Sequence, residues 1–177
     1  MWGKIRYALV ALVVLAATLL LMPGTAEAAT YDDFDFIIKS DGTVEVTRYV
    51  GDGGSVIIPD EINGGSVTSI GSSAFYYCSS LTSITIPDSV TSIGERAFYG
   101  CSSLTSIDVD SNNPNYASID GVLYNKGLTT LIQCPGGKSG DFIIFDSITS
   151  IGDYAFAACA SLTSITIPDS VTSIGNS

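Results

Sequence analysis

Cysteine and the acidic side chains are the residues of this chain best suited to chemistry, because histidine is absent. Without histidine, neither a histidine-based catalytic triad nor a histidine-ligated metal site can form. Serine and threonine are abundant, but no motif places a base where it would activate one of their hydroxyl groups. The acidic residues are scattered over predicted turns, whereas a polysaccharide lyase needs them on one face. The sequence therefore predicts a protein that is not an enzyme and has no cofactor.

Four cysteines, Cys78, Cys101, Cys134 and Cys159, lack the C-x-x-C spacing of redox or metal motifs. Three of them recur at one position of the repeat described below, which favours a ladder of buried thiols packing as small hydrophobic side chains. The alternative is a disulfide between Cys78 and Cys101, since neighbouring repeats would bring their Cα atoms within about 4.4–6.8 Å. Cys134 is the odd member of the set, and its thiol could be exposed.

The segment Asp108-x-Asp110-x-Asn112 has the spacing of the first ligands of a calcium loop. Such a loop also needs glycine at its sixth position and glutamate at its twelfth, where this chain has Asn113 and Ile119. We therefore favour a turn stabilised by its Asx side chains over a metal site.

These residues sit within an internal repeat. Residues 79–94 and 160–175 are nearly identical, and the block V-T-S-I-G begins at Val67, Val90 and Val171. An interval of about 23 residues is the signature of a leucine-rich-repeat or similar solenoid.

Alignment of the copies produces columns of one residue type, which we expect to point inward and stack along one continuous core. The columns are Val67, Val90, Ile148 and Val171; Ile70, Ile93, Ile151 and Ile174; Ala74, Ala97 and Ala155; Phe75, Phe98 and Phe156; Cys78, Cys101 and Cys159; Leu81, Leu104 and Leu162; Ile84, Ile107 and Ile165; and Ile86, Val109 and Ile167.

Within one unit, the alternation over residues 81–86 predicts a strand, and residues 90–93 predict a second extended piece. Residues 95–101 place alanine, phenylalanine and cysteine at helical spacing, which predicts a short helix. The expected fold is therefore a strand-dominated α/β repeat solenoid of the leucine-rich-repeat class. Each coil of about 23 residues would hold a strand plus a short helix.

The domain boundaries follow from the same pattern. Residues 29–66 are expected to form an N-terminal β cap and the first coil, with a β-hairpin over residues 34–49 covering the open end of the stack. Residues 67–177 would be leucine-rich repeats, interrupted at 110–147 by a degenerate coil and a hairpin turning at residues 125–127. Because the sequence stops within a repeat, we interpret it as truncated at the C-terminus.

The first 28 residues have the order of parts of a secretory signal peptide. Lys4 and Arg6 precede an apolar run over residues 7–22, and the small residues Ala26 and Ala28 flank one variable position and provide a cleavage site. The alternative is an uncleaved anchor, which would be the only membrane contact that the sequence predicts.

The chain carries 18 acidic and 7 basic residues, a formal net charge of -11. Nucleic acids and anionic lipids bind to clustered lysine and arginine, so this balance predicts that neither is a partner.

The motif A-F-x-x-C-S-S-L-T-S-I-x-I-P-D-S-V-T-S-I-G resembles the BspA-like, or Treponema pallidum-type, leucine-rich repeats of bacterial surface proteins. The resemblance covers roughly residues 34–177, and Ala97-Phe98, Cys101, Leu104 and Pro87-Asp88 carry it. It implies a secreted or cell-surface protein that binds an extracellular protein or cell-surface ligand and lacks catalytic residues.

Outward-facing strand positions are the candidate binding face, because repeat proteins often recognise extended partners on a concave surface. The alternative is a solvated sheet face, and the tyrosines could instead shield the turn side. A spacer that displays another domain is the second functional hypothesis, after adhesion. The candidates are Thr82, Ser83, Thr85, Thr105, Ser106, Asp108, Thr163, Ser164 and Thr166 on the strands, with Tyr76 and Tyr99 in a second outward column.

Overall fold

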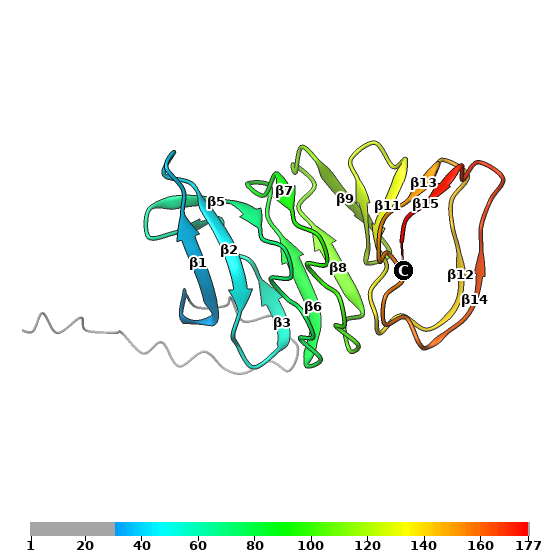
Figure 1. Ribbon diagram of the computed structural model, residues 1–177, viewed down its shortest axis with the longest axis horizontal. Helices are drawn as coiled ribbons and strands as arrows, with labels where there is room; N and C mark the ends of the chain where they lie inside the picture. The colour runs from blue at the N-terminus through cyan, green and yellow to red at the C-terminus, as the bar shows by residue number, and fades with distance from the viewer. Residues whose placement is uncertain (1–30, 177) are drawn as a thin grey trace, which may run out of the picture.

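Successive repeats wind into coils that lie side by side along the long axis of the molecule in the computed structural model (Figure 1). The structure describes residues 31–176, so the predicted signal peptide at residues 1–28 lies outside the described residues. A typical coil carries one longer strand, such as β6 (Leu81–Ile86), and one short strand, such as β7 (Ser92–Ile93).

The longer strands form parallel sheets in which each residue type lies beside its equivalent in the next coil. In the first sheet, β3 (Gly54–Ile57), β6 and β8 (Ser106–Val109) are neighbours, and the register pairs Ile84 with Ile107. Ile84 and Ile86 are fully buried, because the side chains of a strand alternate between the core and the outside. Leu81 is fully buried as well, and a register shift separates it from the alternating part of β6.

A second sheet contains the short strand β7, and the N-terminal hairpin extends this sheet. β1 (Phe34–Ile38) pairs antiparallel with β2 (Val44–Tyr49), and β2 continues in parallel to β5 (Gly65–Ile70) and then β7. The two-residue strand β4 (Glu61–Ile62) pairs antiparallel with β5. The hairpin expected over residues 34–49 is therefore present.

The predicted short helix is wrong. Residues 94–101 and their equivalents form two successive β-turns, 94–97 and 98–101, linked by a third turn over residues 96–99. Each turn is closed by a backbone hydrogen bond between its first and fourth residues, and the third residues of the two successive turns are the ones with positive φ angles. These two residues, Arg96 and Gly100, have φ angles of 56° and 78°, as type II turns require. Within residues 31–176 the single helical element is the one-turn 3-10 segment η1 (Tyr31–Asp33).

Hydrogen bonding between coils is the reason for the turns. The N–H groups of Ser73, Phe75 and Tyr77 donate to carbonyl oxygens of the next coil at 2.8–3.0 Å, and the N–H groups between them close the local turns. An α-helix directs its N–H groups along its own axis and cannot pair alternate ones with a neighbouring coil. Apolar residues spaced by three or four therefore face the core here without a helix.

The stack is interrupted by an antiparallel segment that we call the seam, residues 116–134. It contains β9 (Tyr116–Ile119), β10 (Val122–Asn125) and β11 (Thr130–Gln133), joined by two hairpins. The hairpin at residues 125–127 is predicted correctly. The other hairpin turns at Asp120-Gly121, where the φ angles are 50° and 74°. An Asp-Gly pair favours such a turn, but this hairpin was not predicted.

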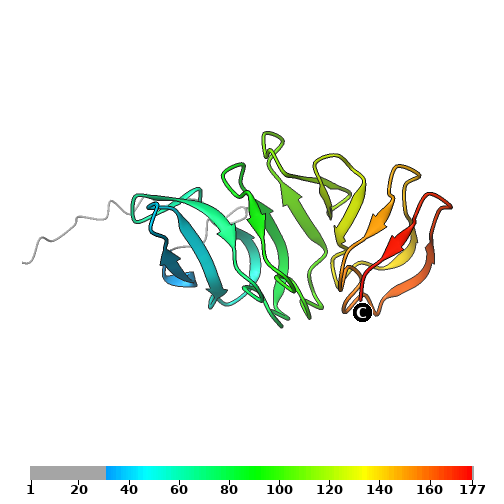
Figure 2. The same cartoon turned by 45° about the horizontal axis from the view of Figure 1, so that its top comes forward.

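Beyond the seam the parallel stacking resumes (Figure 2). β12 (Gly140–Ile143) pairs with β14 (Leu162–Thr166), while β11, β13 (Ser150–Ile151) and β15 (Ser173–Ile174) continue the other side.

β10 separates two hydrophobic cores. Leu123 belongs to the core formed by the coils before the seam, whereas Val122 and Tyr124 belong to the core after it. All three side chains are buried, because alternate residues of a strand point to opposite faces. Both Phe75 and Phe98 are buried as predicted, but burial declines in the last coil.

Candidate binding surfaces

No group of three or more histidine, cysteine, aspartate or glutamate side chains is placed to hold a metal within residues 31–176. The segment considered as a calcium loop is a turn, in which Asp110 Oδ1 accepts the N–H of Asn112 at 2.8 Å. Asp108 is engaged with Ser106, whose hydroxyl donates to both of its carboxylate oxygens. None of the described helical segments is long or apolar enough to span a membrane.

The structure divides the polar strand candidates between two sheets. Register pairs Ser83 with Ser106 and Thr85 with Asp108 across β6 and β8. Three candidates lie apart on β14, beyond the seam. The nine residues are Thr82, Ser83, Thr85, Thr105, Ser106 and Asp108 on or beside β6 and β8, and Thr163, Ser164 and Thr166 on β14.

Many of these polar groups already bond to one another. Ser83 Oγ donates to Ser55 Oγ at 2.6 Å, and Thr105 Oγ1 donates to the carbonyl oxygen of Thr82 at 3.0 Å. Hydrogen bonds of this kind satisfy the strip internally, so a partner would have to compete with them.

The β14 section is arranged around a carboxylate of the preceding coil. Thr163 and Ser164 donate to Asp141 Oδ1 at 2.6 and 2.7 Å. These two bonds, the one from Thr163 first, hold the pKa of Asp141 below its usual value, because they favour the charged form.

A more open surface lies on the turn side. We call it the tyrosine patch: Tyr76, Tyr77, Tyr99 and Tyr154, with Arg96. Tyr76 stacks on Tyr99 with ring centroids 5.4 Å apart and an interplanar angle of 16°, as the repeat predicts. Tyr77 packs edge-on against both rings. Tyr76 and Tyr77 are 48% and 60% exposed, so their rings face solvent.

Arg96 and Tyr154 extend the patch across the seam. The Tyr154 ring lies 5.7 Å from the Tyr99 ring, and the Arg96 guanidinium lies over Tyr154 at 4.3 Å from its centroid. Arg96 also donates to the Tyr154 hydroxyl, which raises the pKa of Arg96 further. Arg96 and Tyr154 occupy equivalent repeat positions, each directly before an alanine of the repeat, but the irregular seam lies between them and separates them by 58 residues, so the sequence did not predict their contact.

Backbone geometry places the tyrosines. Tyr77, Gly100 and Ala158 occupy one position of the second turn, with φ angles of 55°, 78° and 63°. A Cβ added at Gly100 would lie 2.9 Å from the Tyr77 ring, so this glycine leaves room for the ring. Tyr76, Tyr99 and Ala157 occupy the preceding position.

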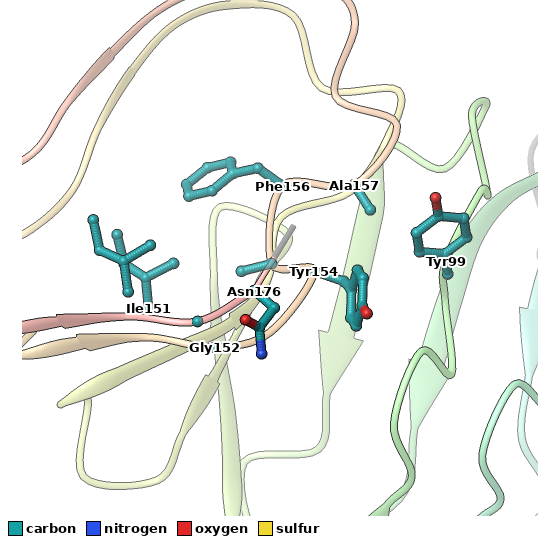
Figure 3. A pocket seen from close by; sticks show the side chains of 10 residues that line it. Tyr99, Ile151, Gly152, Tyr154, Phe156, Ala157 and Asn176 are labelled. Atoms are coloured by element: carbon teal, nitrogen blue, oxygen red, sulfur yellow. The ribbon is translucent and has the colours of Figure 1, made fainter.

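Two hollows lie beside the patch. A pocket of about 200 Å³ is lined by Tyr99, Tyr154, Phe156, Ala157 and Ile174, among others (Figure 3). In earlier coils the equivalent space is filled by the alanine and phenylalanine of the next coil. We therefore regard this pocket as the open face of the stack rather than as a ligand cavity.

A second hollow of about 200 Å³ lies at the seam, between Arg96 and Asp153. The hollow results from a shortened coil. Leu131 pairs with Ile151, and the backbone N–H of Cys134, only three residues after Leu131, donates to the carbonyl oxygen of Ala155, four residues after Ile151. The seam coil is thus two residues shorter than the next and lacks the first turn. The Arg96–Tyr154 contact bridges the resulting gap.

Coils with parallel strands on a common apolar core define the protein as a leucine-rich-repeat solenoid. The chain belongs to the BspA-type leucine-rich-repeat family, whose model matches in six copies over residues 55–132 and 137–177.

Solved structures of bacterial leucine-rich-repeat proteins are similar. A protein from Eubacterium ventriosum is 34% identical, with a TM-score of 0.61, over 70% of this chain and 34% of that one. One from Bacteroides ovatus is 27% identical, with a TM-score of 0.52, over 84% and 43%. The T. pallidum leucine-rich-repeat protein is 28% identical, with a TM-score of 0.49, over 84% and 54%. The chain thus spans only part of each. No curated protein matches it.

Proposed function

We propose that this protein is a secreted or cell-surface adhesion module that binds an extracellular protein or cell-surface ligand through the tyrosine patch. The observation that carries the proposal is the gathering of four tyrosines and an arginine on the exposed turn side. Tyrosine and arginine are enriched at the energetic centres of protein interfaces. The family membership and the signal-like N-terminus support an extracellular site of action.

The tyrosine patch is a better candidate than the polar strip for two reasons. Its rings support one another by stacking, so little side-chain entropy is lost when a partner orders them. The hydroxyl groups of the strip, by contrast, are partly occupied by bonds such as that between Ser83 and Ser55.

The test is a pair of matched double variants of the full chain. Tyr76→Ala with Tyr77→Ala gives the patch the residues that the chain itself carries at 157 and 158, so the turn should be retained. Thr82→Ala with Thr105→Ala is the control on the polar strip. Biolayer interferometry against immobilised extracellular matrix proteins and cell surfaces should show binding at least about tenfold weaker for the tyrosine variant.

Two outcomes would contradict the proposal. Equal or greater weakening by the threonine variant would move the binding site to the polar strip. If the unchanged protein captured no ligand from the panel, the spacer hypothesis would replace adhesion. That hypothesis is favoured by one fact, that the chain spans only 34% of the E. ventriosum protein.

A further inference from the structure

Cys134 does not lie in the cysteine column of the repeat. Because the seam coil is two residues short, the Cys134 N–H donates to Ala155 in the way that the Phe75 N–H donates to Ala97. Cys134 therefore takes the place of a core phenylalanine, and its side chain is fully buried. The expectation that its thiol could be exposed is wrong.

This displacement brings Cys134 against Cys159 of the next coil. Cys159 Sγ lies 3.6 Å from the carbonyl oxygen of Cys134 and 3.4 Å from that of Pro135. The Cys159 thiol donates to both carbonyl oxygens, so it lies directly against the backbone of Cys134. The two residues come from different columns, so the side-by-side placement of residues in one column does not apply to them.

Cys78 and Cys101 provide the contrasting pair. They share one column of parallel coils, so their Cα–Cβ bonds run side by side, a poor starting geometry for a disulfide. Cys101 Sγ instead lies 3.0 Å from the carbonyl oxygen of Phe75 and donates to it.

The same arrangement separates the thiols by reactivity. The neighbouring Cys134 side chain lowers the pKa of Cys159, which is only half-buried, while Cys159 and then burial raise the pKa of Cys134. Burial raises the pKa of Cys78 and raises that of Cys101 to about 12. Cys159 is therefore the thiol that reaches the reactive thiolate form most readily.

We propose that Cys134 and Cys159 form a disulfide when the folded protein meets a disulfide oxidant, while Cys78 and Cys101 remain thiols. The Cys159 thiolate attacks one sulfur of a small-molecule disulfide and expels the other as a thiolate. Cys134 gives up its proton, and its sulfur attacks Cys159 Sγ, expelling the second small-molecule thiolate. The two cysteines lose two electrons and two protons, and the oxidant is reduced to two thiols. The bond ties the seam to the coil that follows it.

Peptide mapping tests this directly, because cleavage after Arg48, Arg96, Lys126 and Lys138 places each cysteine in a different tryptic peptide. The reduced full chain is incubated folded with oxidised glutathione, quenched with iodoacetamide and digested without reductant. The expected product is a linked pair of peptides 127–138 and 139–177, with Cys78 and Cys101 carbamidomethylated.

The Cys159→Ser variant should lose the linked pair, and the Cys78→Ser variant should retain it. Four carbamidomethylated cysteines in the unchanged protein, or a link between Cys78 and Cys101, would overturn the proposal. Should Cys159→Ser fail to fold, the map of the unchanged protein still decides. Its oxidation in urea, where the pairing becomes statistical, shows that the folded geometry directs the bond.

Discussion

Asn113 is a polar side chain buried completely within a stack of apolar ones. Its Nδ2 donates to the carbonyl oxygens of Pro87 and Val90 at 2.8 and 2.9 Å. Its Oδ1 accepts the N–H groups of Asn115 and Tyr116 at 3.0 and 2.9 Å. One amide thus satisfies four backbone groups where the chain leaves the repeat and enters the seam.

Replacing Asn113 with alanine should lower the free energy of unfolding by about 3 kcal/mol or more, because backbone groups of the neighbouring coil lose their partners. Urea denaturation followed by circular dichroism measures this. The control is Asn112→Ala at the adjacent exposed position, which should change stability by less than about 0.5 kcal/mol. Equal effects would mean that the Asn113 amide is dispensable.

The sequence did not predict this role. Asn113 entered the sequence analysis only as a residue that spoils a calcium loop, since its partners are 23 and 26 residues away. The columns were predictable because identical residues recur at a fixed interval, and a residue that appears once provides no such signal.

At the scale of elements, the strands were predicted correctly, whereas the segments predicted as short helices are β-turns. Two type II turns and a helical turn both bring apolar residues spaced by three or four to one side. The positive φ angles that distinguish them fall on Ser73, Tyr77, Arg96, Tyr154 and Ala158 as well as on Gly100. Only the glycine indicates such a conformation in the sequence. The Tyr76–Tyr99 stack was predictable from the repeat, whereas the Arg96–Tyr154 contact depends on the shortened seam coil.

A glycine column lets neighbouring coils approach closely. A Cβ on Gly94 would lie 2.6 Å from the carbonyl carbon of Gly71 and closer still to the Ser72 nitrogen. Because both atoms belong to the backbone, the coils themselves would have to move apart.

We expect Gly94→Ala to cost at least about 2 kcal/mol of unfolding free energy, as overpacked interiors do. Gly127→Ala is the matched control, since its nearest neighbour is Asn125 Nδ2 at 3.8 Å. Thermal unfolding should separate the two variants. A Gly94 variant as stable as the control would refute the close approach of the coils.

At the scale of the whole molecule, strand β10 lies between the two hydrophobic cores and contributes side chains to both. In a solenoid each coil contacts chiefly its neighbours, so local damage spreads over a limited distance. The β10 strand limits it further, because its faces belong to different cores.

Leu81 and Leu131 test this separation, because both are leucines with no exposed surface, one in each core. Alanine at either position should cost about 2–5 kcal/mol. Hydrogen exchange followed by mass spectrometry should show faster exchange mainly over residues 54–109 for Leu81→Ala and over residues 137–176 for Leu131→Ala. The same rise in both halves for both variants would show that the solenoid opens as one unit.

The in-register pairing of like residues also bears on how such a chain can change during evolution. Unequal recombination between the near-identical segments at 79–94 and 160–175 would remove or duplicate the intervening coils together with the whole seam, and equivalent residues would still lie beside one another in the coils that remain. A breakpoint inside the seam would not have this property, since β10 serves two cores at once. The array can therefore lengthen or shorten in whole units, while the seam must be gained or lost as one piece.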